Sequence, residues 1–298
     1  MSLIRSNFVE MEGSIQKVLD TIVKNNVDLT KEFYNIQKST RSQENHLGTG
    51  EMGLMTEWAG QVNYDEFAKG HENNYRHVKY STGIQIEREL LDDEEFAEIK
   101  KRTTKKAYAV MKTLNFHAVQ AFEQAFGTFL SADGLSLCNA SHTIVPGADA
   151  QSNISTSALT VDSLETAMKT MREFKDDKGH PMMYMPDMII CGEGLRKTAQ
   201  QIVGSDREAY TADNQKNVYK SEEGMQYFCT PWITGNKWFL VDSKAMKDGG
   251  HLNWYMRRDP RKFEYQDDFD TEVGKYKAVG RWSLGADSPF FIIGHNVA

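Results

Sequence analysis

The chain has 298 residues, a length at which a single hydrophobic core begins to divide, so one large domain or two interleaved domains are expected. Hydrophobic residues make up 40% and charged residues 26%, a globular composition that excludes disorder of the whole chain. The formal net charge is -7 without a clustered excess of Lys and Arg, which excludes a basic nucleic-acid binder. No apolar stretch approaches the ~20 residues that span a bilayer, and no signal peptide is visible.

The cysteine pattern argues against a disulfide framework and against a zinc site. Cys138, Cys191 and Cys229 are odd in number, far apart in the sequence and without C-x-x-C spacing. A reducing compartment fits this pattern, and we expect no bound metal and no cofactor.

Residues 1–50 are predicted to form an N-terminal arm. Apolar residues recur at roughly helical spacing and indicate one short amphipathic helix: Val9, Ile15, Val18, Leu19, Ile22 and Val23. Polar residues dominate from 37 to 50. Two interpretations stay open, a loosely packed leader or an arm that orders only against neighbouring copies.

Residues 51–90 are predicted to form a long β-hairpin. Strict alternation within residues 75–88 is typical of a half-buried strand, and the positions on one face are Val78, Tyr80, Thr82, Ile84 and Ile86. The expected partner strand is the segment 54–62, which carries Trp58. Because a two-stranded ribbon this long is not stable alone, we expect it to lie on another surface, in the same subunit or in a neighbour.

Residues 92–127 are predicted to form one long helix. Asp92 and Asp93 can cap it, two further acids follow in the first turn, and Gly127 can end it. Its apolar face advances in steps of three and four along Phe96, Ile99, Thr103, Ala107, Val110, Leu114, Ala118, Phe122 and Ala125. Such a helix spans about 50 Å, which indicates an elongated subunit.

The rest of the chain mixes short helices and strands. After a loop at 128–158 we expect a helix capped by Thr160 or Asp162 that ends near 178–179, a buried strand at 188–191, a helix at 193–203, a surface loop at 204–224, a buried strand at 238–241, an alternating strand at 276–284 and an apolar run at 290–293. This order predicts an α+β fold and not a regular βαβ alternation.

Four segments carry a resemblance to a known family. They are the strand-to-helix passage IQIERELLDD at 84–93, the turn-and-His segment DGLSLCNASH at 133–142, PDMIIC at 186–191 before a helix, and KWFLVD at 237–242 with the downstream Arg258-Asp259-Pro260. In their order and spacing they resemble the major capsid proteins of tailed bacteriophages, especially the Mu-like head subunits. The resemblance spans about residues 50–290.

The resemblance implies a division of the chain into parts. These are an N-terminal arm at 1–50, an extended β-hairpin loop at 51–90, a peripheral domain at 91–159 with a spine helix at 92–127, an axial domain at 160–250, and C-terminal strands at 251–298 that return to the peripheral domain. In the family the extended loop lies over an adjacent subunit, which would supply the surface that a lone ribbon needs.

The resemblance also implies a function as a structural protein and not as an enzyme. The chain would assemble with itself, as hexamers and pentamers, into an icosahedral phage head in the host bacterial cytoplasm, and it would enclose DNA without sequence-specific binding. Because the leader before the loop is only about 50 residues long, a separate scaffolding protein is expected, beside portal and head-completion proteins. The candidate intersubunit contacts are Trp58, Arg76, Lys79, Glu87 and Arg88.

Two alternatives remain. An encapsulin, a bacterial nanocompartment shell protein of related fold, would copurify with an enzyme cargo. A soluble hydrolase would use His142, the most site-like residue. The neighbouring Ser141 would point to the opposite side of an extended chain, so a structural role for His142 is the stronger prediction.

Overall fold

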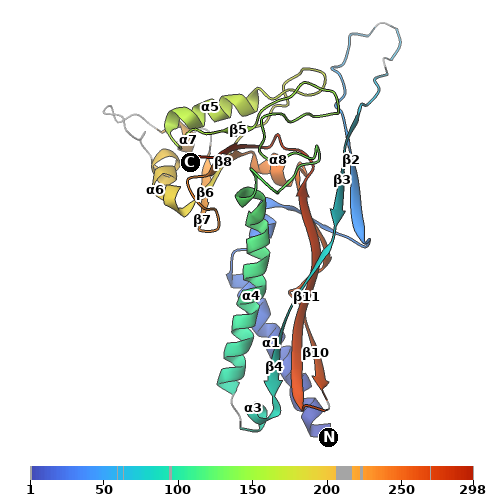
Figure 1. Ribbon diagram of the computed structural model, residues 1–298, viewed down its shortest axis with the longest axis vertical. Coiled ribbons are helices and arrows are strands. Elements are labelled where there is room, and N and C mark those ends of the chain that lie inside the picture. Colours follow the sequence, from blue (N-terminus) through green and yellow to red (C-terminus); the bar gives the residue numbers. More distant parts are fainter. Residues whose placement is uncertain are drawn as a thin grey trace.

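The computed structural model describes residues 2–58, 60–62, 64–93, 96–205, 217–221, 224–268 and 270–297. The chain builds a long stalk with a second lobe at one end, and a two-stranded ribbon rises beside both (Figure 1). The N-terminus lies at the foot of the stalk and the C-terminus lies in the lobe.

The stalk is organised by one long strand, β11 (Val273–Ala286). It pairs along one edge with β4 (Val78–Glu87), and along the other edge first with β10 (Phe263–Asp268) and then with β9 (Leu252–Arg258). The change of partner coincides with a bulge between Arg281 and Trp282. A fifth strand, β1 (Asn35–Lys38), joins β9 in parallel. The strand predicted at 276–284 is confirmed, but its burial alternates only as far as Ala278, because Val279 and Ser283 on the opposite face are buried as well.

The spine helix α4 (Phe96–Glu123) covers this sheet. The predicted apolar face from Ile99 to Phe122 is buried, which confirms its helical periodicity. The predicted start at Asp92 is wrong, because Asp92 ends a separate short helix, α3 (Arg88–Asp92), and pairs with Arg88 at 3.3 Å. Glu94 and Glu95 lie outside the described residues.

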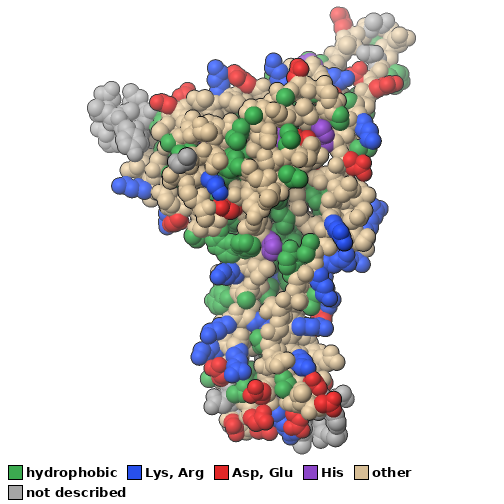
Figure 2. All heavy atoms as spheres, viewed as in Figure 1, with side chains coloured by type: hydrophobic (Ala, Val, Ile, Leu, Met, Phe, Trp, Pro, Cys, Tyr) green, Lys and Arg blue, Asp and Glu red, His purple; other side chains and the backbone are tan. Residues whose placement is uncertain are grey.

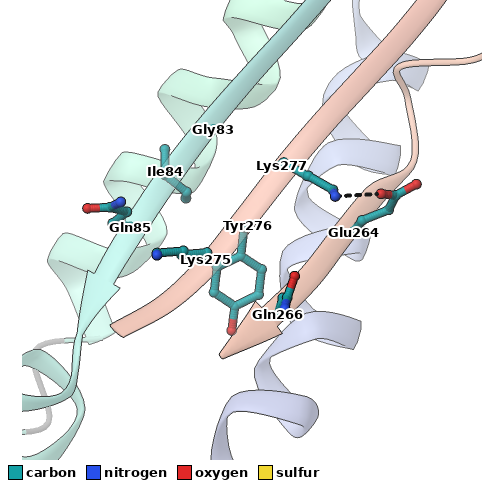
Figure 3. A pocket seen from close by; sticks show the side chains of 8 residues that line it. All are labelled: Gly83, Ile84, Gln85, Glu264, Gln266, Lys275, Tyr276 and Lys277. Carbon is teal, nitrogen blue, oxygen red and sulfur yellow. Dashed lines mark ion pairs between the residues drawn. The ribbon is translucent and has the colours of Figure 1, made fainter. Parts of the chain in front are cut away.

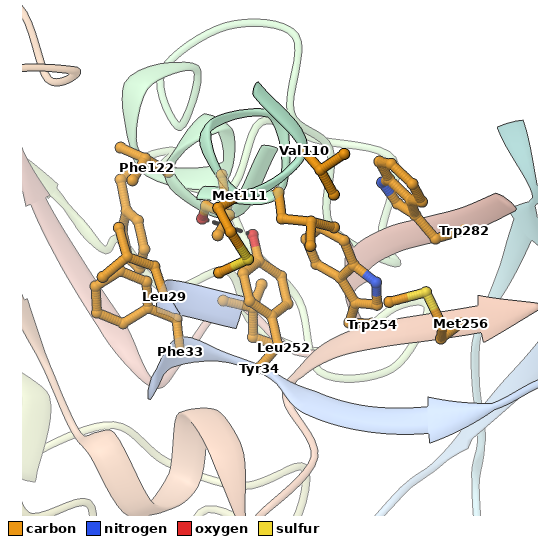
Figure 4. Packing of buried hydrophobic residues seen from close by; sticks show 14 of the residues in the cluster. Leu29, Phe33, Tyr34, Val110, Met111, Phe122, Leu252, Trp254, Met256 and Trp282 are labelled. Atoms are coloured by element: carbon orange, nitrogen blue, oxygen red, sulfur yellow. Dashed lines mark hydrogen bonds between the residues drawn. The ribbon is translucent and has the colours of Figure 1, made fainter. Parts of the chain in front are cut away.

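The N-terminal segment is part of the stalk core from Ile15 to Tyr34, so both interpretations of a loose or neighbour-ordered arm are wrong for those residues. Helix α1 (Ser2–Asn25) packs along α4, and α2 (Leu29–Phe33) follows. The side chains before Gly13, including Val9, lie outside the described part. Tyr34 is buried against Trp254 and donates its hydroxyl to the carbonyl of Ala118 at 2.9 Å (Figure 4).

Polar contacts also tie this segment to the C-terminal strands. Arg261 binds Asp28 at 2.6 Å, and both side chains are largely buried. The Gln16 amide bonds the carbonyl of Arg261 and the backbone N–H of Phe263, each at 3.1 Å. Such contacts reach across more than 200 residues of sequence, and local periodicity carries no information about them.

The lobe contains a second sheet with the order β5-β12-β8-β6-β7. Its strands are β5 (Ile154–Ser155), β6 (Met188–Gly192), β7 (Gln226–Thr230), β8 (Trp238–Val241) and β12 (Ile292–His295). Helix α5 (Val161–Arg172) begins at a capping box between Thr160 and Ser163, as one of the two predicted caps, but it ends at Arg172 and not near 178–179. The predicted strands at 188–191 and 238–241 are confirmed.

Short helices complete the lobe. The predicted helix at 193–203 is one helical segment in three forms, the 3₁₀ turn Glu193–Leu195, α6 (Arg196–Ala199) and the π-turn Gln200–Gly204. Of the predicted loop at 204–224, residues 206–216 and 222–223 lie outside the described part, and α7 (Val218–Ser221) is helical. Helix α8 (Ser243–Lys247) starts at the cap Asp242.

The hairpin prediction placed the wrong strand opposite residues 75–88. Strand β3 (Lys69–Arg76) pairs with β2 (Gln43–Thr49), and the segment 54–62 forms no strand within its described residues. The predicted run is also divided at His77, since β3 pairs with β2 while β4 pairs with β11. Strand β2 is polar and lacks an apolar alternation, because most of it is exposed.

We predict that Phe33→Ala lowers the free energy of unfolding of the unassembled subunit by about 3–5 kcal/mol. Phe33 is 1% exposed and meets the rings of Phe122 and Phe228 at 5.1 and 5.2 Å. Urea unfolding measures the change. The control Val27→Ala removes a side chain that is 63% exposed, and we expect a change within about 0.5 kcal/mol. Equal effects of both variants would show that α2 lies outside the cooperative core.

Candidate intersubunit surface

Residues 50–68 connect β2 to β3. Nearly all of this connection is exposed and rich in apolar residues, and we call residues 51–67 the loop tip. Figure 2 shows it standing clear of the body of the molecule at the upper right. Seven large apolar side chains of the tip are more than half exposed: Met52, Leu54, Met55, Trp58, Val62, Tyr64 and Phe67. The tip also holds four acidic residues, Glu51, Glu57, Asp65 and Glu66, and no Lys or Arg. A contiguous exposed apolar segment of this kind marks an interaction site.

The base of the tip is held by backbone hydrogen bonds. The N–H of Gly50 donates to the carbonyl of Ala68 at 2.8 Å, and the N–H of Glu51 donates to the Asp177 carboxylate at 2.8 Å. Within the tip, the N–H of Gly53 donates to Asp65 at 2.9 Å. The tip therefore leaves the lobe at a defined point.

Lower down, the ribbon is joined to the stalk by hydrogen bonds around one carboxylate, the Asp287 cluster (Asp287, His46, Asn73, Tyr75 and Asn253). His46 Nδ1 lies 2.8 Å and Asn253 Nδ2 lies 2.7 Å from Asp287 Oδ2. Tyr75 Oη and Asn73 Nδ2 donate to the other carboxylate oxygen. Burial and then the adjacent Asp287 raise the pKa of Tyr75 above 10, so the phenol keeps the proton that it donates.

The close approach of Tyr75 depends on a glycine. An added Cβ at Gly285 would collide with the Tyr75 ring, so only glycine lets the ribbon lie directly on β11.

The junction between β3 and β4 is a buried histidine. His77 Nε2 lies 2.8 Å from the Ser39 hydroxyl and His77 Nδ1 lies 2.9 Å from the Ser283 hydroxyl. Burial is the main cause that lowers the pKa of His77 below its ordinary value of 6.5. The nearby charges of Arg281 and Arg257 lower the pKa further, whereas the charge of Glu44 raises it. The neutral ring thus joins the end of β1, the ribbon and β11 at one place.

The exposed side of the stalk sheet is rich in cations. We call Lys79, Lys275, Lys277 and Arg281 the basic face. Lys275 pairs with Asp268, and Lys277 lies 3.4 Å from Glu264. Lys79 and Arg281 are directly paired across β4 and β11, and within the described part of the chain neither has a carboxylate partner. Two adjacent like charges without a counter-charge favour an acidic partner.

A hollow of about 400 Å³ lies beside these lysines (Figure 3). Its lining side chains come from β4, β10 and β11: Gly83, Ile84, Gln85, Glu264, Gln266, Lys275, Tyr276 and Lys277. Figure 3 shows Lys277 directed toward Glu264. Its charged side chains, Lys275, Lys277 and Glu264, lie at the edge of the basic face.

The sequence-predicted contact residues fall in different surroundings. Trp58 is 69% exposed on the loop tip, and Arg76, Lys79 and Glu87 are exposed along the ribbon and β4. Arg88 instead pairs within its own chain, with Glu272 at 3.1 Å and Asp92 at 3.3 Å. The intersubunit role of all five stays a prediction.

His142 lies in a buried structural pair and not at an open site. Its Nδ1 is 2.5 Å from Asp133 Oδ2 and its Nε2 is 3.2 Å from the carbonyl of Leu137, while Ser141 is exposed. Burial raises the pKa of Asp133, but the hydrogen bonds from His142 and from the N–H of Leu135 outweigh it, and the pKa is lowered. Both ring nitrogens of His142 are occupied, which argues against a hydrolase and supports the predicted structural role.

Nowhere in the described ranges do three or more His, Cys, Asp or Glu side chains gather in a way that could hold a metal ion. Among the helices that the structure describes, none combines the length and apolarity needed to cross a membrane.

Sequence reasoning missed the Asp287 cluster, the His77 junction and a contact between Cys191 and Cys229. The last two residues stand opposite each other on β6 and β7, 38 positions apart. None of the three has a local signal, because each is made by strand pairing between distant segments.

We predict that Asp287→Ala frees the ribbon from the stalk without unfolding the lobe. The change leaves the donors on His46, Tyr75 and Asn253 without their acceptor. We expect amide hydrogen exchange in β2 and β3 to accelerate by about tenfold or more, the equivalent of one lost charged hydrogen bond. Asp149→Ala is the matched control, since Asp149 is exposed in a loop. Unchanged exchange in β2 and β3 would contradict the anchoring role.

We predict that His77 makes the subunit less stable in mild acid. The pKa of His77 is lower in the folded chain than its ordinary 6.5, so the unfolded chain takes up the proton first. Its contribution is complete above about pH 6.5 and is lost as the pH falls below that value. Urea unfolding at about pH 7.5 and about pH 5.5 should show a smaller loss for His77→Gln than for the unchanged chain. An equal loss would contradict the assignment, because the other histidines are common to both proteins.

Comparisons with known proteins agree with this geometry. A model of the phage capsid protein family matches residues 72–292, most of the chain. A procapsid of bacteriophage JBD30 has a similar fold, with 12% identity and a TM-score of 0.56, over 98% of this chain and 76% of that one. A virus-like particle from Pyrococcus furiosus matches at 10% identity and a TM-score of 0.57, over 96% of this chain and 100% of that one.

A phage-related protein from Bordetella bronchiseptica RB50 matches at 11% identity and a TM-score of 0.55, over 94% of this chain and 96% of that one. The comparison with curated proteins gives no match. The solved structures confirm the predicted α+β capsid fold, with its ribbon, spine helix and mixed lobe. The family match establishes that the chain belongs to the phage capsid protein family, and the solved structures show that it has the fold of a phage capsid subunit.

Proposed function

We propose that the loop tip of one subunit docks on the basic face of a second copy, and that this contact builds the shell. The observation that carries the proposal is the tip itself, with seven exposed large apolar side chains and four acidic residues without a basic one. In its own chain the tip stands clear of the body of the molecule (Figure 2). A second copy offers the complementary charge in Lys79 and Arg281, which lack carboxylate partners among the described residues.

The two kinds of side chain have different tasks in this contact. Burial of a large apolar side chain contributes about 1.5–3 kcal/mol, so several of them together can offset the cost of association. The acids contribute less affinity, but they select the cationic surface and exclude acidic ones. Trp58 is the natural anchor, since tryptophan is enriched among the residues that dominate interface energy.

The domain division belongs to the same proposal. We assign residues 51–90 to the extended loop, whose ribbon also includes β2 (Gln43–Thr49). Residues 91–159 are assigned to the peripheral domain, 160–250 to the axial domain and 251–298 to the returning strands. The stalk supports the peripheral assignment, because α4, β9, β10 and β11 share one core cluster. A second cluster beneath α5 supports an axial unit, although β6 and β8 give one face to this cluster and the other face to the stalk cluster.

The finer roles rest on the family resemblance. We infer hexamers and pentamers as capsomers, assembly in the bacterial cytoplasm, and scaffolding, portal and head-completion proteins as partners. The net charge of -7 supports enclosure of DNA without strong attachment to its phosphates.

An encapsulin-type shell is the second candidate, favoured by the similarity to a virus-like particle. Mass spectrometry of purified particles separates the two, because a nanocompartment would carry a stoichiometric cargo enzyme. The phage family match favours the first candidate.

A charge-swap experiment tests the docking. Lys79→Glu with Arg281→Glu, or Glu57→Lys with Glu66→Lys, should each lower shell yield by about tenfold or more at low salt, because like charges then face each other. A chain with all four changes should recover yield, since the pairs are restored in the opposite sense. Light scattering and negative-stain electron microscopy measure closed shells and capsomer rings.

The matched control is Lys197→Glu, a reversal at an exposed lysine of α6 in the lobe. Its yield should equal that of the unchanged chain. Wild-type yield in both double variants, or no recovery in the fourfold variant, would contradict docking between these two surfaces. A clean monomer in every condition, with a scaffold co-expressed, would contradict the shell function itself.

A further inference from the structure

The lobe holds two cysteines in direct contact. Strands β6 and β7 run parallel as neighbours, and Cys191 and Cys229 stand opposite each other in their register. Their sulfur atoms are 3.0 Å apart, and both thiols are free. Cys191 is fully buried, whereas Cys229 is half-buried.

The backbone geometry suits a bond between these sulfurs. Neighbouring strands lie about 4.8 Å apart, within the range of about 4.4–6.8 Å between the Cα atoms of a disulfide. The sulfurs already point at each other, so the strands need not move apart or rotate. The third cysteine, Cys138, is buried elsewhere, against Gly294 and Phe126, and burial raises the pKa of its thiol.

The surroundings make Cys229 the reactive member of the pair. It is the more exposed of the two. The hydrogen bond with the Cys191 thiol is the largest influence and lowers the pKa of Cys229, while burial and Glu193 oppose this. Arg196, which pairs with Glu193 at 3.0 Å, adds a smaller lowering. A thiolate is the nucleophilic form of cysteine, so oxidation begins at Cys229.

We propose that Cys191 and Cys229 form a redox pair that closes to a disulfide when the subunit meets a peroxide, and that this bond ties β7 to β6. The Cys229 thiolate attacks one oxygen of the peroxide, and the O–O bond breaks to give a sulfenic acid and hydroxide. The hydroxide takes the proton released from the Cys229 thiol and becomes water. The sulfur of Cys191 then attacks the sulfenic sulfur, the S–O bond breaks, and the departing hydroxyl leaves as water with the Cys191 proton. Two thiols lose two electrons, and the peroxide is reduced to two waters.

The disulfide would be a covalent crosslink between β6 and β7 within the lobe, and we call this crosslink the clasp. It encloses the segment between residues 191 and 229, which includes α6 and α7. Closing this loop restricts the unfolded chain and should raise Tm by about 5 °C. A reducing cytoplasm keeps both thiols free, so the clasp closes only after the protein has left such a compartment.

The test uses the full chain, reduced and then treated with hydrogen peroxide. Under denaturing alkylation, we expect one of the three thiols to remain reactive, and peptide mapping should join Cys191 to Cys229. Tm should rise with the bond and return to its first value after dithiothreitol. Cys138→Ser should keep both effects, whereas Cys191→Ser and Cys229→Ser should lose both.

Other outcomes overturn the proposal. Three alkylatable thiols after peroxide, a sulfinic acid on Cys229, or a bond that includes Cys138 would contradict the pair. A bond between Cys191 and Cys229 without a change in Tm would contradict the clasp. If Cys191→Ser does not fold, the peptide map of the unchanged chain and the Cys229→Ala variant still decide the matter.

Discussion

The half-buried carboxylate of Asp287 receives hydrogen bonds from three separate strands. It follows directly after β11, the strand that pairs with three others in the stalk. His46 and Tyr75 bring the two strands of the ribbon to it, and Asn253 brings β9. A two-stranded ribbon has too little core to be stable alone, so its direction depends on this carboxylate, on the buried His77 junction and on Gly285, whose missing side chain admits Tyr75.

The parts of the fold that the sequence predicts well are those with a strong local period. The spine helix shows an apolar residue at every third or fourth position, and its buried face follows that pattern from Ile99 to Phe122. The strand at 276–284 alternates, and the strands at 188–191 and 238–241 are short apolar runs bounded by turn residues. The spacing in the helix records one buried face, and the continuous apolar runs record strands that are buried on both faces.

The predictions were wrong where the structure depends on which distant segment packs against a stretch of chain, and not on the spacing of its own apolar residues. Segment 54–62 was the expected partner strand, yet its large apolar side chains are exposed and it forms no strand within its described residues, while the true partner β2 is polar and exposed. The polar residues at 37–50 indicated a loosely packed arm, although Leu19, Phe33 and Tyr34 are buried in the core of the stalk. The Asp287 cluster and the cysteine pair join residues far apart in the chain, and only the sheet topology brings them together.

In the proposed docking, an acidic and apolar tip on a held ribbon would limit unwanted association of free subunits. Free subunits of net charge -7 repel one another at long range, and four acids keep two loop tips from meeting through their apolar side chains. A cationic surface would attract the acidic tip, and the burial of the apolar side chains of the tip would then supply the affinity. Because the bonds at Glu51 and Asp287 already restrict the ribbon, the proposed docking would order less of the chain and would lose less entropy.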